Sequence, residues 1–442
     1  LLAAGKGTRM HSDSPKVLQA VLGKPLLGYV FDALAHVPPG LVWTVIGFGA
    51  HEVRAAFAAR DLQFVLQEEQ LGTGHAVSLA WPEIVASGLT HVCVLNGDTP
   101  YVPVQEVEAL ADLCRDEGAA MGMLTLELEN PFGYGRVVRS PDGTVLRVVE
   151  EKDFDAVEYG GEINEVNSGV YVFDVAQCSW LLAKMDRDNA QCEFYLTQLI
   201  SLCAEAGLCV AGMPFGSSEL LRGINSPQEL VDFEEALRAR IVAGHLRSGV
   251  ILRGGSSIVI GPDVEIEPGA EIVGPCEIYG RTRIERGARI SSHCWIRDAV
   301  LGPCQVKSFS HIEGARIGEG ASVGPYARLR PGADIGRKAR VGNFVEVKNA
   351  TLHEGAKAGH LSYLGDSDIG ADVNIGAGTI TCNYDGVRKH RTEIREKAFI
   401  GSNTALVAPV VVGAGAVFGA GSVLTKDVPD AALCVARARQ TN

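Results

Sequence analysis

The sequence predicts an α/β chain in three parts: an N-terminal sheet domain, one connecting helix and a C-terminal parallel β-helix of hexapeptide repeats. Two patterns support this prediction. In the first half, short apolar runs alternate with helical patterns, as in a doubly wound sheet. In the second half, apolar residues return every six residues, a period that fits neither an α-helix nor a plain strand. At 442 residues the chain is also too long for one ordinary core.

The repeat is strictest in its first section, where isoleucines follow one another at intervals of six. They are Ile260, Ile266, Ile272, Ile278, Ile284, Ile290 and Ile296. Two residues before each of them lies a small or β-branched residue. In a hexapeptide β-helix one apolar residue per hexad points into the core, and stacking buries it against the next coil.

The repeat continues from Ile317 and again from Ile394, but it is not kept everywhere. It slips by one residue near Gly314 and near Ala350, and 381–393 interrupt it. Slips and insertions in a solenoid mark loops on a functional edge. We therefore expect the regular section to be a scaffold and the chemistry to gather near the slips.

The N-terminal half contains four apolar runs and four helical patterns. The runs predict strands of a mostly parallel sheet at 41–47, 90–95, 119–128 and 166–173. The helical patterns predict covering helices at 25–34, 74–79, 104–115 and 194–206. Leu1 already lies in an expected strand, so we expect a short segment to precede it.

A single helix is expected from about Asn225 to 246. Asn225 or Ser226 can cap it, and Pro227 suits its first turn. The expected domains are therefore 1–222 for the sheet domain, 223–247 for the linker helix and 248–442 for the β-helix.

The composition limits the class of protein. A net charge of −13 argues against a nucleic-acid partner, because phosphate binding needs many Lys and Arg side chains. No apolar stretch has the length of a membrane span, and we expect no charged and apolar leader before the first strand. The 11 cysteines show no paired spacing, which predicts a reducing, cytoplasmic location.

The first candidate site is the glycine-rich turn L-A-A-G-K-G-T-R-M at 2–10, followed by P-K at 15–16. Such a turn after a strand exposes backbone N–H groups to an anion, and Arg9 and Lys16 add positive charge. A plain βα turn is the competing interpretation. The spacing excludes a Walker A loop and a dinucleotide fingerprint.

This turn and later motifs resemble sugar-1-phosphate nucleotidylyltransferases. The later motifs are Q-E-E-Q-L-G-T-G-H-A at 67–76, N-G-D-T-P at 96–100, G-Y-G-R at 133–136, V-E-E-K-D at 149–153, N-S-G at 167–169 and G-I-N at 223–225. Followed by a hexapeptide solenoid, almost the whole chain resembles the bacterial family that joins an N-acetylglucosamine-1-phosphate uridylyltransferase to a glucosamine-1-phosphate N-acetyltransferase. That resemblance implies a Rossmann-like nucleotidyltransferase domain and a left-handed parallel β-helix.

The resemblance also implies roles in the uridylyl site. Asp98 and Asn225 would hold Mg²⁺, although Asp98 as a turn carboxylate and Asn225 as a helix cap are competing interpretations. The remaining residues would bind UTP and N-acetylglucosamine-1-phosphate. Those assigned to the nucleotide are Leu2, Ala3, Gly5, Arg9, Lys16, Gln67, Gly72 and Thr73, and those assigned to the sugar are Asn96, Gly135, Glu150, Asn167 and Asn225. Asn96 departs from the family, where well-known members carry an aromatic residue.

The second candidate site lies where polar residues gather on successive hexads of the β-helix, so that they stack along one face. A solvated surface is the competing interpretation. Acyl transfer to an amine needs a base that removes a proton, and a histidine suits that task. The motif G-H-L-S-Y-L-G-D at 359–366 makes His360 the candidate base, with Glu346 as its orienting partner. We expect His75, His293 and His311 to be structural.

The resemblance places further ligands around this base. Arg330 and Lys348 would hold the sugar phosphate, and Tyr363, Asn374 and Lys389 the sugar. The acetyl-CoA contacts would fall on Ala377, Asn383, Tyr384, Ser402, Ala420 and Arg437. Solenoids of this type usually assemble as homotrimers, with acyl-CoA sites between neighbouring chains.

The sequence therefore predicts a cytoplasmic enzyme with two activities. The β-helix acetylates glucosamine-1-phosphate, and the N-terminal domain couples the product to UTP, giving UDP-N-acetylglucosamine for cell-wall polysaccharides. One rival is a monofunctional nucleotidylyltransferase whose β-helix serves only oligomerisation or regulation. Another is a trimeric scaffold without catalysis.

Overall fold

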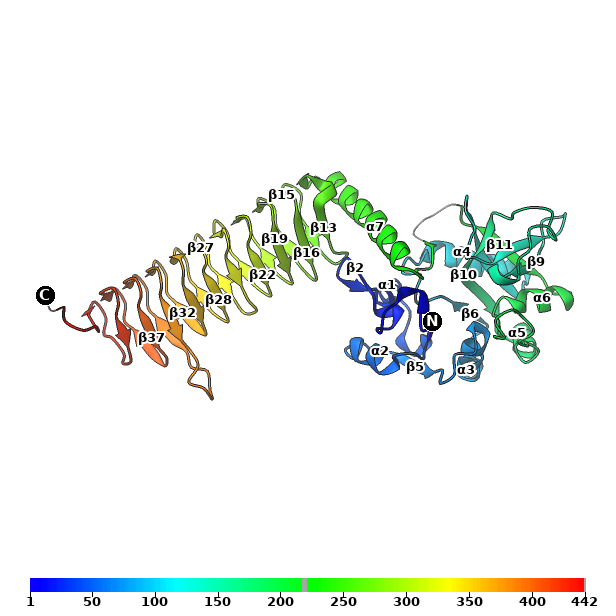
Figure 1. The fold of residues 1–442 in the computed structure, drawn as a ribbon, viewed down its shortest axis with the longest axis horizontal. Helices are drawn as coiled ribbons and strands as arrows, with labels where there is room; N and C mark the ends of the chain where they lie inside the picture. Colours follow the sequence, from blue (N-terminus) through cyan, green and yellow to red (C-terminus); the bar gives the residue numbers. More distant parts are fainter. Residues whose placement is uncertain (217–220, 441–442) are drawn as a thin grey trace. The chain divides into compact units, whose positions relative to one another are not determined.

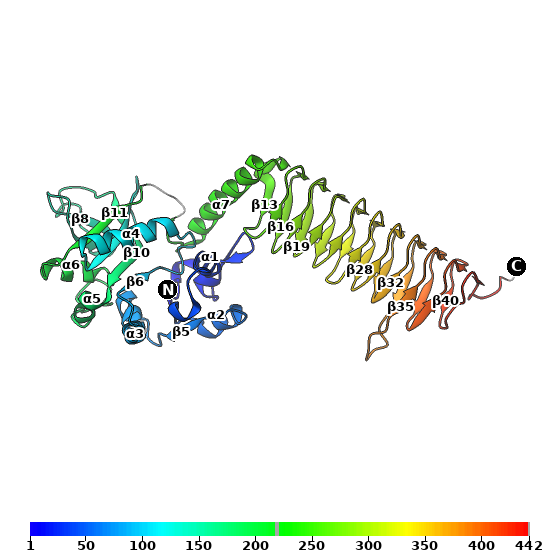
Figure 2. The same ribbon diagram turned by 180° about the vertical axis from the view of Figure 1, so that it is seen from behind.

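The computed structural model describes residues 1–216 and 221–440 (Figure 1, and from behind in Figure 2). Its contacts divide the chain into two compact units, Leu1–Ala236 and Leu237–Asn442. The division falls inside α7 (Pro227–Arg247), the expected connecting helix. Across the described residues, no helix has the length and apolar character needed to cross a membrane.

The first unit is an α/β domain. Its strands are β1 (Leu2–Ala3), β2 (Ala20–Val21), β3 (Lys24–Pro25), β4 (Trp43–Ile46), β5 (Gln63–Leu66), β6 (His91–Val94), β7 (Met121–Glu127), β8 (Arg136–Arg139), β9 (Val145–Val149), β10 (Glu165–Asp174) and β11 (Val210–Pro214). Its helices before α7 are α1 (Leu26–Ala33), α2 (Ala50–Ala56), α3 (Thr73–Ala86), α4 (Val104–Glu117), α5 (Val175–Leu182) and α6 (Gln198–Glu205).

Its strands pair in a mixed pattern rather than the mostly parallel one that the sequence predicted, because β10 pairs antiparallel with β6, β7 and β8, and β8 pairs antiparallel with β9. β5, β4 and β1 pair in parallel in that order. The Leu2 N–H donates to the Leu95 oxygen (2.9 Å) and the Gly97 N–H to the Leu2 oxygen (2.8 Å), which puts β1 beside the end of β6. β6 then pairs antiparallel with β10, β10 antiparallel with β7, and β7 parallel with β11. The chain segments after β1 and β6 therefore leave the same edge of the sheet.

Helix α3 is longer than the sequence predicted. The sequence predicted a helix that ends at residue 79, and Pro82, which lacks an N–H, costs the observed helix one hydrogen bond. The structure continues to Ala86 because Val77, Trp81 and Ile84 lie on one face and are buried in the core. Packing of this apolar face outweighs the missing bond.

The second unit is a parallel β-helix with three faces. The first face carries β12 (Ile251–Arg253), β15 (Glu271–Val273), β18 (Arg289–Ile290), β21 (Gln305–Val306), β24 (Ser322–Val323), β27 (Arg340–Asn343), β30 (Lys357–His360), β33 (Asn374–Ile375), β36 (Phe399–Ile400), β39 (Val417–Phe418) and β41 (Leu433–Cys434). The second carries β13 (Ile258–Ile260), β16 (Cys276–Tyr279), β19 (Cys294–Arg297), β22 (His311–Glu313), β25 (Arg328–Leu329), β28 (Glu346–Lys348), β31 (Tyr363–Gly365), β34 (Ile380–Cys382), β37 (Ala405–Val407) and β40 (Val423–Leu424). The third carries β14 (Glu265–Ile266), β17 (Arg283–Ile284), β20 (Val300–Leu301), β23 (Arg316–Ile317), β26 (Asp334–Ile335), β29 (Thr351–Leu352), β32 (Ser367–Ile369), β35 (Thr392–Ile394) and β38 (Val410–Val412).

The isoleucine repeat forms the core of this β-helix. Ile260, Ile278 and Ile296 are Cα partners on successive coils of the second face, and each is fully buried. The two expected slips are confirmed, because the buried residues Ile317 and Leu352 each follow the preceding core residue after five positions instead of six. The structure adds further five-residue steps that the pattern did not show, which end at Leu301, Val306 and Ile369. Slips thus occur outside the candidate site as well, so they are weaker markers of function than we expected.

Candidate functional sites

The glycine-rich turn of the first unit closes over Lys16. Gly7 has a left-handed φ of 63°, and a Cβ there would lie 2.8 Å from the Cβ of Lys16, so only glycine fits. At Gly5, by contrast, a Cβ would meet nothing within 4 Å, so this backbone faces open space. The turn therefore leaves room for a ligand beside the buried Lys16 side chain.

The two expected metal ligands converge on one cation. The Lys16 ammonium is bonded to the Asp98 carboxylate and donates to the Asn225 side-chain oxygen at 2.9 Å. The Ile224 N–H donates to the Asp98 backbone oxygen at 2.9 Å, which holds the two loops together. A carboxylate and an amide oxygen that already share a positive charge fit a hard divalent cation.

The capping of α7 leaves Asn225 available for this role. The Glu229 N–H donates to the Ser226 hydroxyl at 3.3 Å, and the Asn225 N–H donates to the Glu229 carboxylate at 2.7 Å. Ser226 is thus the cap, and the Glu229 carboxylate reaches back to the residue before it rather than to Ser226 itself. The side chain of Asn225 is therefore not the helix cap.

The segment expected to bind uracil lies at the start of α3. The buried Gln67 donates from its side-chain nitrogen to the Gly72 oxygen at 3.1 Å, and the same nitrogen lies 3.1 Å from Nδ1 of His75. The Thr73 hydroxyl accepts from the Leu196 N–H at 3.1 Å. His75 thus supports Gln67 rather than a ligand, which agrees with its expected structural role.

The residues expected to hold the sugar also lie together. The Asn167 N–H donates to the Gly135 oxygen at 2.9 Å, and Glu150 accepts from the Thr197 hydroxyl at 2.8 Å. Burial raises the pKa of Glu150. Asn96 packs against the backbone of Gly169, two residues after Asn167.

Two residues of this cluster were not predicted. Thr197 bonds Glu150, and the Tyr171 hydroxyl accepts from the Asn167 side chain at 2.5 Å. Burial raises the pKa of Tyr171, so the phenol stays protonated. Neither residue lies in a recognisable motif, and only the fold brings them to the site.

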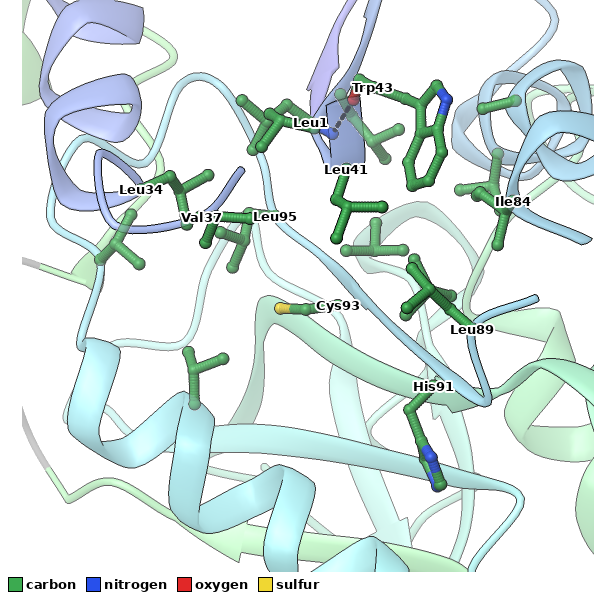
Figure 3. Close-up of a pocket in the computed structure, with 18 of the residues that line it drawn as sticks. Leu1, Leu34, Val37, Leu41, Trp43, Ile84, Leu89, His91, Cys93 and Leu95 are labelled. Atoms are coloured by element: carbon green, nitrogen blue, oxygen red, sulfur yellow. Dashed lines mark hydrogen bonds between the residues drawn. The ribbon is translucent and has the colours of Figure 1, made fainter. Parts of the chain in front are cut away.

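A cavity of about 280 Å³ lies elsewhere in this unit (Figure 3). Leu41 and Trp43 line it at the beginning of β4, and Leu89 and His91 at the beginning of β6. These are the amino ends of the strands, whereas Asp98 follows the carboxyl end of β6. Of the predicted uridylyl-site residues only Leu2 lines this cavity, so it is not the candidate site.

In the β-helix, four predicted residues share the second face. Arg330 follows β25, Glu346 and Lys348 lie on β28, and Tyr363 lies on β31. The Arg330 guanidinium donates to the Glu346 carboxylate at 2.9 Å. The neighbouring ammonium of Lys389, together with Arg330, lowers the pKa of Lys348. Three cations thus face one region, which suits a dianionic phosphate.

His360 lies on the turn between the first and second faces, which we call the first corner. In successive coils this turn places one residue at the same position: Ser292, Ser308, Pro325, Asn343, His360, Ala377, Ser402 and Ala420. Nδ1 of His360 lies 2.6 Å from the side-chain oxygen of Asn343. Glu346, the expected orienting partner of His360, is bonded to Arg330 in this structure.

The expected acetyl-CoA residues continue along the first corner. Ala377, Ser402 and Ala420 follow His360 coil by coil, and the Arg437 guanidinium donates to the Ala420 oxygen at 2.7 Å. Small side chains leave this part of the corner open. Before His360 the neighbouring position carries exposed rings instead, and Phe309, Tyr326 and Phe344 stack with centroids 4.9 and 5.3 Å apart. His293 begins this stack, which fits a structural role.

A loop projects from the β-helix after β34 (orange in Figure 1). Asp385 organises it by accepting from the N–H groups of Val387 (2.8 Å) and Arg388 (2.6 Å) and from the His390 ring (2.8 Å). Hydrogen bonds from these groups lower the pKa of Asp385. The loop carries the expected ligands Tyr384 and Lys389.

Asp366 anchors the base of this loop, and the sequence did not single it out as a site residue. It accepts from the Asn349 side chain at 2.6 Å and from the side chain of Asn383, an expected acetyl-CoA residue that is buried. Burial acts to raise the pKa of Asp366, but these hydrogen bonds lower it overall.

Asn374 does not join the cluster on the second face. It lies on β33, on the first face, beside Lys357 of the preceding coil. Tyr363 and Asn374 are therefore separated by the first corner.

Within the described ranges 1–216 and 221–440, no group of three or more His, Cys, Asp or Glu side chains forms a metal site.

Comparisons with known proteins find relatives of both the N-terminal and the C-terminal half of the chain. A model of the MobA-like NTP transferase domain matches residues 1–141, and a model of the bacterial transferase hexapeptide (six repeats) matches residues 314–349. The chain is 54% identical to the bifunctional protein GlmU of Nitratidesulfovibrio vulgaris (strain DP4), over 100% of this chain and 97% of that protein. It is 55% identical to the GlmU of Oleidesulfovibrio alaskensis and 44% identical to that of Acidovorax sp. (strain JS42), in each case over 100% of this chain and 96% of the relative.

Proposed function

Because the chain belongs to the GlmU family of bifunctional uridylyltransferases and acetyltransferases, we propose how its residues divide the two reactions. The β-helix unit transfers an acetyl group from acetyl-CoA to glucosamine-1-phosphate. The first unit joins N-acetylglucosamine-1-phosphate to UTP and releases pyrophosphate, giving UDP-N-acetylglucosamine. Relatives that match the whole chain are named as bifunctional, which favours this assignment over a monofunctional nucleotidylyltransferase or a scaffold.

The convergence of Asp98 and Asn225 on the Lys16 ammonium supports the uridylyl site most strongly. These two oxygen ligands would hold Mg²⁺, which neutralises charge on the transferring phosphoryl group when it is bound. The backbone around Gly5, with Arg9 and Lys16, binds the UTP phosphates.

In this proposal the uracil base and the sugar are bound by different residues. The side-chain oxygen of Gln67 accepts no hydrogen bond from the part of the chain that the structure describes, so it is free to accept an N–H of uracil. Glu150 and Asn167 bind hydroxyl groups of the sugar. Positioning by these groups aligns the sugar phosphate with the α-phosphate of UTP.

The acetyl site rests on His360 and the three cations. Arg330, Lys348 and Lys389 bind the phosphate of glucosamine-1-phosphate. The nitrogen of the amine attacks the thioester carbon, and His360 takes a proton from that nitrogen as the bond forms. The C–N bond forms, the C–S bond breaks, and the proton on His360 passes to the departing thiolate of CoA.

We further propose a homotrimer that works in the reducing cytosol. Asn374 and Tyr363 lie on different faces of one β-helix, and a site shared between neighbouring chains would bring both to one sugar. All 11 cysteines are free, which suits a reducing compartment.

The test is to supply glucosamine-1-phosphate, acetyl-CoA and UTP together with Mg²⁺ and to identify the products. The proposal expects free CoA, pyrophosphate and UDP-N-acetylglucosamine. Pyrophosphate release from added N-acetylglucosamine-1-phosphate without any CoA release from glucosamine-1-phosphate would leave only the monofunctional alternative. Sedimentation of the whole chain tests the trimer separately.

A further inference from the structure

Asn343 stands directly beside the candidate base, one coil before it in the β-helix. Asn343 and His360 are Cα partners in the pairing of β27 with β30. The side-chain oxygen of Asn343 lies 2.6 Å from Nδ1 of His360. An amide oxygen only accepts hydrogen bonds, so this contact requires the proton of the neutral imidazole to be on Nδ1. Nε2 then carries the lone pair that a base needs.

Glu346 is directed elsewhere. Its carboxylate accepts from Arg330 at 2.9 Å on the second face, and the sugar phosphate would be held at this same arginine. A carboxylate that is already shared with a guanidinium has a role in the charge balance of the phosphate site. The amide of Asn343 is the group that contacts the imidazole.

The backbone of the first corner fixes the distance between the two side chains. A Cβ on Gly342 would lie 1.8 Å from the Gly359 oxygen, so the two coils approach closely just before Asn343 and His360. The Leu361 N–H donates to the Asn343 oxygen at 3.1 Å, and the Phe344 N–H donates to the Tyr326 oxygen at 3.0 Å. The stacked ring of Phe344 adds a further restraint on Asn343. The corner is therefore a rigid support rather than a loose loop.

We propose that Asn343 is the positioning residue for acetyl transfer: its side-chain oxygen holds His360 in the tautomer whose Nε2 accepts the proton of the substrate amine. This inference rests on the proposed role of His360 as the base. It assigns to a neutral amide the orienting function that sequence reasoning gave to Glu346.

Three variants of the full-length protein at this position test the inference. Asn343→Leu and Asn343→Ala remove the acceptor, and we expect kcat for acetyl transfer to fall on the order of tenfold to a hundredfold, with little change in KM for either substrate. Asn343→Asp keeps an oxygen that accepts from Nδ1, so it should retain kcat within about threefold of the wild type. The uridylyl reaction of each variant serves as an internal measure of intact protein.

Two further variants provide the controls. Ser308→Ala changes the same corner position two coils earlier and should leave acetyl transfer unchanged. Glu346→Gln should raise KM for glucosamine-1-phosphate through Arg330 more than it lowers kcat.

Wild-type kcat in Asn343→Leu, or equal losses in Asn343→Asp and Asn343→Leu, would overturn the inference. A collapse of kcat in Glu346→Gln, with normal kcat in Asn343→Leu, would return the orienting role to Glu346. His360→Ala distinguishes a failure of the proposed base from a failure of the proposed positioning residue. If this variant still transfers acetyl groups, the proposed base is wrong; if it is inactive while Asn343→Leu is active, only the positioning role fails.

Discussion

The ammonium of Lys16 lies 2.9 Å from the side-chain oxygen of Asn225, although 209 positions separate the two residues in the sequence. The same ammonium also contacts Asp98. The glycine-rich turn, the end of β6 and the start of α7 therefore meet at one point. In the proposed uridylyl site each of these segments supplies one charged or polar group, and none of them contains the site alone.

Asp98→Asn tests the cation site. Loss of the carboxylate charge should weaken Mg²⁺ binding and lower the uridylyl rate on the order of a hundredfold to a thousandfold, because a preorganised charge is lost. Acetyl transfer should be unchanged. Calorimetric titration with Mg²⁺ and a pyrophosphate assay measure the two effects, and the exposed Asp112 on α4 gives the matched control Asp112→Asn. An unchanged Mg²⁺ requirement would remove Asp98 from the metal site.

Lys16→Gln tests whether the ammonium competes with the metal. Removing it leaves the Asp98 carboxylate without its partner, so Mg²⁺ should bind the nucleotide-free protein about two- to tenfold more tightly. The uridylyl rate should nevertheless fall, because Lys16 also binds UTP phosphates in the proposed site. Mg²⁺ affinity equal to that of the wild type would show that the ammonium and the metal do not share these ligands.

Glu150→Gln tests the buried carboxyl group. Burial raises its pKa, so the folded protein keeps this proton at pH values at which the unfolded chain has lost it. Wild-type stability should therefore fall as the pH rises from the usual glutamate pKa through the raised one, and the variant should lack this loss. The variant's advantage in thermal midpoint should be largest above the raised pKa and shrink with acid. A difference in thermal midpoint that does not change with pH would contradict this account. In the activity assay, KM of the variant for the sugar phosphate should rise about tenfold.

Ile278 tests the role of the isoleucine repeat. It is fully buried between Ile260 and Ile296, so Ile278→Ala should lower the free energy of unfolding by about 2–5 kcal/mol and Ile278→Val by about 0.5–1.5 kcal/mol. Both activities should persist below the new transition, since this coil lies far from His360 along the β-helix. Denaturant unfolding measures the loss. If Ile278→Ala lowers the free energy of unfolding by less than about 0.5 kcal/mol, the repeat does not form the core.

The sequence predicted those features that a periodic pattern records. Buried positions repeat at fixed intervals, so the β-helix faces and the main strands such as β7 and β10 were predicted correctly. The glycine-rich turn and Asp98, which the sequence assigned to one site, lie together in the structure, because the ends of adjacent strands meet at one edge of a sheet. The length of α3 was missed because tertiary packing of Trp81 and Ile84 outweighed the local effect of Pro82.

The partner of His360 was missed for a different reason. Exposed polar residues on a corner follow no hydrophobic period, so Asn343 carries no signal of its own in the sequence. Only the register of β27 with β30 brings it beside the imidazole. Likewise, Asn225 and Ser226 are both good capping residues, and only the folded chain shows that the Glu229 N–H bonds the Ser226 hydroxyl while the Asn225 side chain contacts Lys16.

The division of the two reactions between the units is the central claim, and product analysis with His360→Ala tests it most directly. Given glucosamine-1-phosphate, acetyl-CoA and UTP, the variant should form no UDP-N-acetylglucosamine and release no CoA. Given N-acetylglucosamine-1-phosphate and UTP, it should form UDP-N-acetylglucosamine at the wild-type rate. Loss of both reactions, or retention of both, would contradict the account.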